Sequence, residues 1–271
     1  MKVLSCKGHE LPIGDRTIIM GILNVTPDSF SDGGSYVTVE DAIHRAQQMV
    51  EDGADIIDIG GESTRPGSAE VTEEEELRRV IPVIEALSRE INVPISIDTY
   101  KAEVAKQALA AGAHIINDVW GGQADSRMAD VAASYDCPFI ITHNRLNTEY
   151  KDFLPEVLSD LQLYVNQARD AGVRDERIIL DPGIGFAKSY EQNLQLMNQL
   201  RPLVDLGYPV LLGTSRKSVI GMTLNLPPAE RLEGSLSTVV LGIAQGCGIV
   251  RVHDVLATKR AAVMTDAIIR S

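Results

Sequence analysis

The stretch Ile95-Ser96-Ile97-Asp98 is a short apolar run that ends on a carboxylate, and the segment Lys101 to Ala111 after it has helical periodicity. Gly112 follows this segment and supplies the left-handed stop that often ends a helix before the next strand. A second apolar run, Ile115-Ile116, then ends on Asn117. The stretch therefore predicts a strand, a covering helix and a further strand that runs parallel to the first.

The same pattern of apolar run and helical segment occurs eight times along the chain. The polar residues at or near the ends of the runs are Asn24, Asp58, Asp98, Asn117, His143, Asp181, Lys217, Arg251 and His253. The helical segments cover residues 39–51, 73–90, 101–111, 125–135, 154–171, 190–206, 230–245 and 254–269. Eight such units in 271 residues favour a closed (β/α)₈ TIM barrel over a doubly wound open sheet.

No proline-rich or serine-rich linker interrupts the series, so we expect residues 1–271 to form a single domain. Residues 1–16 precede the first strand, and we expect them to form a short hairpin that plugs the opposite end of the barrel. An unpaired buried polar group costs about 1–3 kcal/mol, so polar strand ends have no structural advantage of their own. Since barrel enzymes place their chemistry at the carboxyl ends of the strands, these ends predict an active-site rim.

The chain has 25 basic and 38 acidic residues and a formal net charge of −13, which argues against nucleic acid or an anionic membrane as its main partner. No apolar stretch approaches the roughly 20 residues needed to span a membrane, and the N-terminus lacks the apolar core of a secretory signal. The expected location is therefore the cytoplasm. Cys6, Cys137 and Cys247 have no C-x-x-C spacing, so neither a disulfide framework nor a zinc site is indicated.

Two long loops punctuated by glycines follow the first and second apolar runs, at residues 24–34 and 60–68. Most connections in compact domains are shorter, so these loops fit two interpretations, mobile lids over a site or solvated surface loops. The candidate cations are Arg65, Arg216, Lys217, Arg251 and His253. Because the last two strand loops of such barrels often bind phosphate, these cations indicate an anionic substrate or leaving group.

Three strand ends, Asp98, Asn117 and Asp181, carry hydrogen-bonding groups that complement the cations. A carboxylate and an amide can match the adjacent donors and acceptors on the edge of a flat amino-pyrimidinone ring. His143 fits two interpretations, a satisfied rim histidine or one that contacts a ligand, and Asp58 has no assigned task. No paired-histidine spacing indicates a tightly held transition metal.

Two long motifs carry a resemblance to a known family: Gly21-Ile22-Leu23-Asn24-Val25-Thr26-Pro27-Asp28-Ser29-Phe30 and Arg251-Val252-His253-Asp254-Val255. With the strand ends between them, they closely resemble the dihydropteroate synthase family of the folate pathway over essentially the whole chain. The resemblance implies a transferase that condenses 6-hydroxymethyl-7,8-dihydropterin diphosphate with p-aminobenzoate, giving 7,8-dihydropteroate and pyrophosphate. It also implies a barrel fold, Mg²⁺ as cofactor, a homodimer and inhibition by sulfonamides.

Carried across position by position, the family's functional residues fall into three groups in this sequence. The resemblance places the pterin edge against Asp98, Asn117, Asp181 and Lys217. It places the diphosphate against Asn24, Thr64, Arg65, Arg251 and His253, with Asn24 also a ligand of Mg²⁺. It places p-aminobenzoate against Phe30, Thr64, Pro66, Phe186 and Ser218. The implied catalytic residues are Asp98, Lys217 and Arg65.

These roles imply a dissociative, SN1-like loss of pyrophosphate. Cations neutralise the departing charge, and the carboxylate of Asp98 stabilises the cation left on the dihydropterin. Two positions depart from the family, since Thr142 stands where many members have methionine, and Val219 where many have phenylalanine or methionine. We expect these two residues to alter substrate and sulfonamide affinity while leaving the reaction intact.

Two other functions fit a pterin-binding barrel. A methyltetrahydrofolate-dependent corrinoid methyltransferase transfers no diphosphate, so it gives no reason for so many cations to gather beside two long loops. A non-catalytic pterin-binding protein would be indicated by loss of Asn24, Arg65 or Asp98, and all three are present. Release of pyrophosphate distinguishes the synthase from both alternatives.

Overall fold

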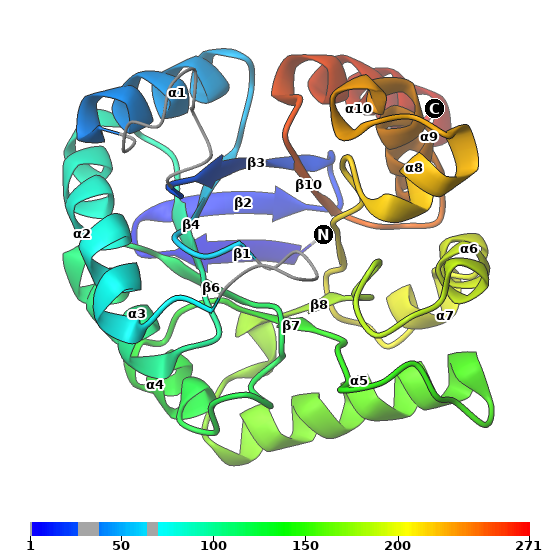
Figure 1. Cartoon of the computed structure of the whole chain (residues 1–271), viewed down its shortest axis with the longest axis horizontal. Coiled ribbons are helices and arrows are strands. Elements are labelled where there is room, and N and C mark those ends of the chain that lie inside the picture. Colours follow the sequence, from blue (N-terminus) through cyan, green and yellow to red (C-terminus); the bar gives the residue numbers. More distant parts are fainter. Residues whose placement is uncertain (1, 27–37, 64–69) are drawn as a thin grey trace.

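Eight parallel strands form a ring at the centre of the computed structural model, which describes residues 2–26, 38–63 and 70–271 (Figure 1). The strands are β3 (Ile18–Asn24), β4 (Ile56–Gly60), β5 (Ile95–Asp98), β6 (Ile115–Asp118), β7 (Phe139–Thr142), β8 (Ile178–Asp181), β9 (Leu211–Leu212) and β10 (Ile249–Val252). Their hydrogen-bonded order is β8-β7-β6-β5-β4-β3-β10-β9, and a parallel bridge between Leu180 and Val210 brings β9 back to β8. The predicted (β/α)₈ barrel is therefore confirmed.

Ten α-helices are present in the described residues, and Figure 1 shows them following one another around the strands. They are α1 (Val39–Glu51), α2 (Glu73–Glu90), α3 (Ala102–Ala111), α4 (Met128–Tyr135), α5 (Phe153–Asp170), α6 (Tyr190–Asn198), α7 (Arg201–Val204), α8 (Ser218–Leu224), α9 (Leu232–Ala244) and α10 (Val255–Ile269). The predicted helical ranges agree with these bounds, apart from small differences at the ends, one break within residues 190–206, and α8, which lies outside the predicted ranges. Within the described ranges, no helix combines the length and hydropathy needed to cross a membrane.

The prediction of one helix over residues 190–206 is wrong, because two helices, α6 and α7, are separated near Leu200. Pro202 lacks the N–H that would bond the carbonyl of Asn198, and in a continuous helix its ring would clash with that carbonyl. Gln245, which follows α9, supplies a substitute acceptor for the Leu200 N–H at 2.8 Å. The apolar pattern does not reveal this break, since the substitute bond comes from a distant part of the chain.

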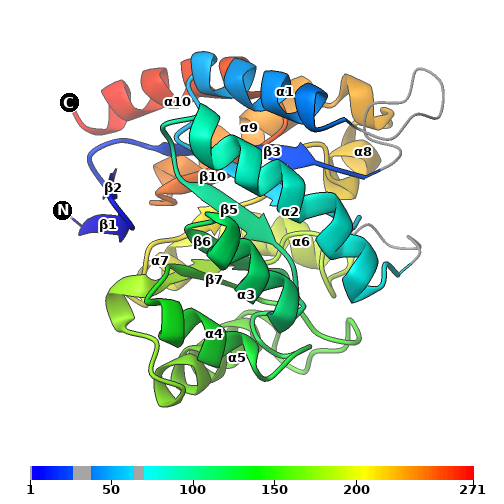
Figure 2. The ribbon, with the colours of Figure 1, turned by 90° about the vertical axis from the view of Figure 1, so that its left-hand side faces the viewer.

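A small antiparallel hairpin, β1 (Lys2–Cys6) and β2 (His9–Ile13), lies at one end of the barrel strands (Figure 2). Its buried side chains are Leu4, Cys6, Leu11 and Ile13. They pack against an interior layer made of Ile18, Met20, Ile56, Ile115, Ile140, Ile179, Leu211 and Ile249. Most of these residues stand at or near the starts of their strands, so the predicted plug is confirmed at the amino-terminal end of the barrel.

A polar cluster lies beyond the apolar layer, toward the carboxyl ends of the strands. It consists of Asp58, Asp98, Asn117, Asp181 and Arg251. Residues two positions apart in a strand point to the same face, so Asp58 shares the barrel interior with Ile56, and Asn117 shares it with Ile115. The alternation that fills the lower interior with isoleucine therefore also directs these polar side chains inward.

Candidate active site

Arg251 of β10 bridges two carboxylates of the polar cluster. Its Nε donates to Asp58 Oδ2 at 2.6 Å, and its Nη2 donates to Asp98 Oδ2 at 2.5 Å. Burial by itself lowers the pKa of the guanidinium, but the charges of Asp58 and Asp98 outweigh this effect and raise the pKa above its usual value. Arg251 is therefore a fixed positive charge that links β10 to β4 and β5.

Asp58 is fully buried and connects Arg251 to Asn117. Its Oδ2 accepts a hydrogen bond from Asn117 Nδ2 at 3.1 Å, in addition to the bond from Arg251. Sequence reasoning assigned Asp58 no task, although it stands near a strand end like the other candidates. The strand continues to Gly60, so Asp58 lies two residues deeper than the rim and holds two predicted ligand-binding side chains in place.

Asp98 and Asn24 lie on either side of Gly60. A Cβ added at Gly60 would lie 3.6 Å from Asp98 Oδ2 and 3.7 Å from Asn24 Oδ1, so both oxygens face the same bare stretch of backbone. Burial raises the pKa of Asp98 to about 7, while Arg251 opposes the rise and neighbouring carboxylates add to it. The buried Oδ1 of Asp98 accepts no hydrogen bond from the described residues. Asp98 is therefore a carboxyl whose protonation state changes near neutral pH.

Asp181 and Lys217 bring opposite charges together beside β8 and β9. Asp181 Oδ1 accepts from the Gly183 N–H at 2.7 Å, and Lys217 Nζ donates to the Ile184 carbonyl at 2.5 Å. Burial raises the pKa of Asp181, and burial lowers the pKa of Lys217 to about 8, while each charge partly offsets the shift of the other. A Cβ added at Gly213 would lie 3.7 Å from Asp181 Oδ2 and 3.9 Å from Lys217 Nζ, so the two groups converge on one point.

The sequence match to a known family covers this whole arrangement. A model of the pterin binding enzyme family matches residues 20–253. This chain belongs to the pterin-binding enzyme family. The dihydropteroate synthase of Clostridium beijerinckii is 58% identical, and the match covers 96% of this chain and 97% of that relative. The dihydropteroate synthase of Bacillus subtilis is 56% identical, over 99% of this chain and 94% of that relative.

Solved structures of similar proteins share the fold of this pterin-binding enzyme. A dihydropteroate synthase from Clostridium difficile, in the presence of pteroic acid, matches with a TM-score of 0.94 and 55% identity over 96% of this chain and 100% of that chain. The Xanthomonas albilineans dihydropteroate synthase with 4-aminobenzoic acid matches with a TM-score of 0.94 and 45% identity over 98% of both chains. Another structure from Xanthomonas albilineans, in complex with 7,8-dihydropteroate, has a TM-score of 0.91 and 43% identity.

Two further basic side chains of this pterin-binding enzyme, Arg216 and His253, lie after β9 and β10. His253 Nδ1 lies 3.0 Å from Ser215 Oγ, which also accepts from the His253 backbone N–H at 3.2 Å. Arg216 instead pairs with Asp254, through Nη2 at 2.5 Å and Nε at 3.0 Å. His253 is therefore held against Ser215 in the loop that follows β9, whereas Arg216 ties this loop to the one that follows β10.

The residues predicted for p-aminobenzoate are only partly described. Lys217 Nζ lies 4.6 Å from the centre of the Phe186 ring, within cation–π distance. Ser218 is exposed at the start of α8, directly after Lys217. The predicted residues outside the described ranges are Phe30, Thr64, Arg65 and Pro66. Their roles, and the two predicted lids that contain them, stay predictions.

His143 is fully buried, and both of its ring nitrogens have partners. Nε2 lies 3.1 Å from Asp160 Oδ2, and Nδ1 lies 2.9 Å from Lys188 Nζ. Of the two interpretations drawn from the sequence, the satisfied histidine is the one that this geometry supports. Lys188 was missed, because it lies in a loop without periodicity and only its burial distinguishes it from a surface lysine.

Thr142 and Val219, the two departures from the family pattern, are both buried. Thr142 pairs in register with Asp181 across β7 and β8. Val219 belongs to α8 and packs into the apolar core between the strands and the helices. Their effects on substrate and sulfonamide affinity stay predictions.

The donor atoms beside Gly60 suit a hard cation that is held mainly by a substrate. In residues 2–26, 38–63 and 70–271, no three His, Cys, Asp or Glu side chains converge as a metal cluster. Asn24 offers an amide oxygen, and Asp98 offers a carboxylate oxygen across the Gly60 backbone. Mg²⁺ prefers oxygen ligands and usually keeps waters and substrate phosphates among them. The residues present therefore fit Mg²⁺ better than a metal enclosed by protein side chains.

Proposed function

We propose that this chain acts as a dihydropteroate synthase, a transferase of folate biosynthesis and a sulfonamide target. It condenses 6-hydroxymethyl-7,8-dihydropterin diphosphate with p-aminobenzoate, giving 7,8-dihydropteroate and pyrophosphate. Relatives of that name are 50–58% identical over 91–99% of this chain. One structural observation carries the proposal: two side chains with hydrogen-bond acceptors and two basic side chains lie together at one rim of the barrel. The acceptors are on Asn117 and Asp181, and the basic side chains are Arg251 and Lys217.

Asp181, Asn117 and Lys217 are the residues that we propose bind the pterin edge. Asp181 uses Oδ1 to hold its own loop, and its Oδ2 lies beside Gly213 and can accept from the adjacent donors of an amino-pyrimidinone. Asp58 accepts from Asn117 Nδ2 and so sets the orientation of that amide. Lys217 supplies a donor for an acceptor atom of the ring.

Arg251, His253 and Asn24 are the described residues that we propose hold the diphosphate. A guanidinium has five N–H donors, and Arg251 uses one on Nε for Asp58 and one on Nη2 for Asp98. We expect a phosphate oxygen to bind other donors of the same guanidinium. When bound by Asn24 and the diphosphate, Mg²⁺ would neutralise the negative charge that develops on the leaving group.

The proposed reaction breaks the bond between the pterin methylene carbon and the diphosphate oxygen. The bonding electrons leave with pyrophosphate, and the carboxylate of Asp98 stabilises the positive charge left on the methylene carbon and the ring. The amine nitrogen of p-aminobenzoate then donates its lone pair to this carbon and loses a proton to pyrophosphate or water. Phe186, next to Lys217, keeps the second substrate close to the first.

A two-substrate assay tests this function. Purified protein with both substrates and Mg²⁺ should form dihydropteroate and release an equal amount of pyrophosphate, and chelation of Mg²⁺ should lower the rate reversibly. Methyl transfer from methyltetrahydrofolate to a corrinoid would instead identify the methyltransferase. Pterin binding without product would identify a non-catalytic binding protein.

We also propose that the protein forms a homodimer through the outer faces of α9 and α10. These two helices pack side by side (Figure 1). The exposed large apolar side chains of these helices are Val240, Leu241, Leu256, Val263, Met264, Ile268 and Ile269. Contiguous exposed apolar surface commonly marks a protein interface. Light scattering should show a dimer for the unmodified protein and a shift toward monomer for Val263→Asp. If the two proteins have the same mass in solution, this interface is wrong.

We also place the protein in the cytoplasm, on the basis of its cysteines. Cys6, Cys137 and Cys247 are buried free thiols, and burial raises the pKa of each thiol to about 12. Unpaired thiols are usual in reducing compartments. Cell fractionation with an antibody to the native protein tests this location.

A further inference from the structure

The loop between β8 and α6 is held from two sides by lysine side chains. Lys217 Nζ donates to the carbonyl of Ile184 at 2.5 Å. Lys188 Nζ donates to the carbonyls of Gly183 and Phe186, both at 2.9 Å. Three backbone carbonyls within a few residues are therefore fixed by ammonium groups.

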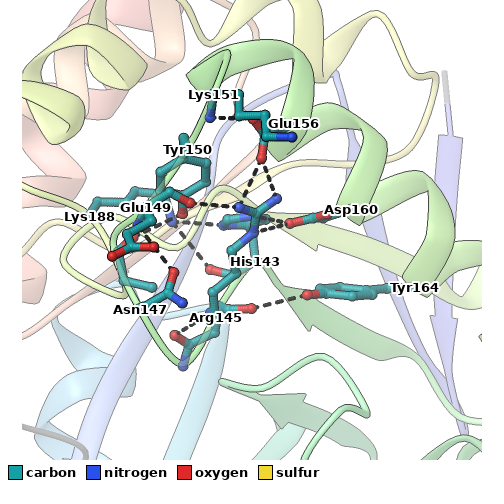
Figure 3. A network of polar contacts seen from close by, with 12 residues as sticks. His143, Arg145, Asn147, Glu149, Tyr150, Lys151, Glu156, Asp160, Tyr164 and Lys188 are labelled. Atoms are coloured by element: carbon teal, nitrogen blue, oxygen red, sulfur yellow. Dashed lines mark hydrogen bonds and ion pairs between the residues drawn. The ribbon is translucent and has the colours of Figure 1, made fainter.

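Lys188 is only 8% exposed, and four acceptors surround its Nζ. Besides the two loop carbonyls, they are the carbonyl of His143 at 3.3 Å and His143 Nδ1 at 2.9 Å, as Figure 3 shows. A charged ammonium fits this set, since all three of its N–H donors point to acceptors. Because Lys188 donates to Nδ1, the proton of the neutral imidazole lies on Nε2.

A second row of contacts connects His143 to helix α5 (Figure 3). His143 Nε2 donates to Asp160 Oδ2 at 3.1 Å, and Arg145 Nε donates to the same oxygen at 2.6 Å. Arg145 also donates to Glu156 Oε2 at 3.0 Å. The ammonium of Lys188 is thereby linked through a buried imidazole to Asp160 of α5, and Arg145 links Asp160 to Glu156 on the same helix.

The β8–α6 loop contacts two residues that we propose bind the pterin. The Gly183 N–H donates to Asp181 Oδ1 at 2.7 Å, and the loop contacts Lys217 through a backbone carbonyl and a phenylalanine ring. A Cβ at Gly183 would overlap the carbonyl oxygen of His143, so the loop packs directly against the His143 backbone. Movement of the loop away from His143, to which Lys188 anchors it, would therefore disturb Asp181 and Lys217 together.

We propose that Lys188 is a positioning residue for the synthase reaction: it fixes the β8–α6 loop so that Asp181 and Lys217 meet the pterin. His143 and Asp160 hold the ammonium of Lys188 in place, and none of these three residues needs to touch a substrate. The inference rests on the proposed function.

The titration behaviour of His143 agrees with this arrangement, whereas burial works against the charged form of Lys188. Burial lowers the pKa of His143 to about 3, and Lys188 and Arg145 lower it further while Asp160 opposes them. The imidazole is therefore neutral at physiological pH, as its role of acceptor from Lys188 requires. Burial lowers the pKa of Lys188 to about 7, with Asp181 and Asp160 opposing the shift and Lys217 and Arg145 adding to it.

Steady-state kinetics and amide hydrogen exchange of two variants test the role. Lys188→Met keeps an unbranched side chain without N–H donors, and Lys188→Gln keeps an amide donor without charge. We expect Lys188→Met to raise KM for the pterin diphosphate about tenfold, the size expected for one charge-assisted hydrogen bond, with a smaller change in kcat. Exchange within residues 182–188 should become faster, and exchange elsewhere should not change. Lys188→Gln should fall between Lys188→Met and the unmodified protein.

Lys106→Met is the matched control, because the Lys106 side chain on α3 is 58% exposed. It should match the unmodified protein in both measurements. The positioning role is wrong if Lys188→Met has the original KM and the original exchange within residues 182–188, even where its melting temperature falls. Should Lys188→Met fail to fold, Asp160→Asn carries the same test with a smaller expected effect, since the Asp160 side chain is 21% exposed.

Failure of the proposed function would be distinguishable from failure of this inference. An unmodified protein that forms no dihydropteroate from both substrates and Mg²⁺ refutes the function alone. Calorimetric binding of pteroic acid and exchange of residues 182–188 then decide the role of Lys188. About tenfold weaker binding with faster loop exchange in Lys188→Met would support the role, and unchanged values would overturn it.

Discussion

Asp58→Asn would keep the shape of a fully buried side chain and remove its charge. The bonds affected are those from Arg251 Nε at 2.6 Å and from Asn117 Nδ2 at 3.1 Å. A hydrogen bond to a charged group contributes about 1.5–3 kcal/mol, and removing one partner of a buried ion pair costs about 3–5 kcal/mol. Because Arg251 keeps its second partner, Asp98, we expect the free energy of unfolding to fall by about 3 kcal/mol, the low end of that range.

The same change should weaken binding of the pterin diphosphate. Arg251 and Asn117 lose their shared partner, so we expect KM for this substrate to rise by about tenfold or more, equivalent to about 1.4 kcal/mol. Urea unfolding and steady-state kinetics measure the two effects. The matched control is Asp205→Asn, since Asp205 is an exposed aspartate that pairs with Arg201 at 2.8 Å. Its removal should change stability by less than about 0.5 kcal/mol.

An Asp58→Asn enzyme with unchanged stability and unchanged KM would refute this reasoning, because Arg251 and Asn117 would then hold their positions without the carboxylate. A loss of stability with unchanged KM would be a different result. It would show that Asp58 supports the barrel without preparing its binding groups.

Four further outcomes concern the rim. Asp98→Asn should lower kcat by about 100-fold or more, as expected when a group that stabilises transition-state charge is removed, and an unchanged single-turnover rate would contradict that role. Because the pKa of Asp98 in the free protein is raised to about 7, kcat/KM for the pterin diphosphate should increase as pH rises through about 7, and a pH profile of Asp98→Asn should lack this step. The folded state binds the proton of Asp98 more tightly than the unfolded state does. The contribution of Asp98 to stability is therefore present below about pH 4 and is lost as pH rises through about 7. Unfolding curves at several pH values measure this loss. Gly60→Ala adds a methyl group 3.6 Å from Asp98 Oδ2 and 3.7 Å from Asn24 Oδ1, so KM for the pterin diphosphate should rise while the circular dichroism spectrum stays the same.

Periodicity was sufficient to predict the barrel, because each strand and each helix carries its own apolar pattern. The start and end of α1 and α2 agree with the predicted ranges. The prediction failed within residues 190–206, where Gln245 replaces a bond that the helix backbone would otherwise make. A contact between distant residues decided that break, and a local pattern contains no information about it.

Several rim residues could be predicted, since the carboxyl ends of parallel strands meet at one side of the barrel. Their pairing could not, because it depends on strand register, in which Asp58 lies opposite Ser96 while Asp98 lies opposite Gly60. Lys188 could not be recognised either. Its partner His143 is 45 residues away in the sequence. Lys188 is buried only once β7 and β8, the strands that precede the two residues, have assembled.

The hairpin that fills the amino-terminal end of the barrel has a kinetic consequence. With apolar side chains at that end, both substrates must reach the polar cluster from the same side. Asn117 and Asp181 are 3% and 6% exposed, whereas Ser218 is exposed at the start of α8. Under the proposed function, we therefore expect the pterin that binds the deeper residues to arrive first, because p-aminobenzoate would otherwise stand in its path. We expect this order to follow from the depths of the two subsites among the described residues more than from the relative affinities of the two substrates.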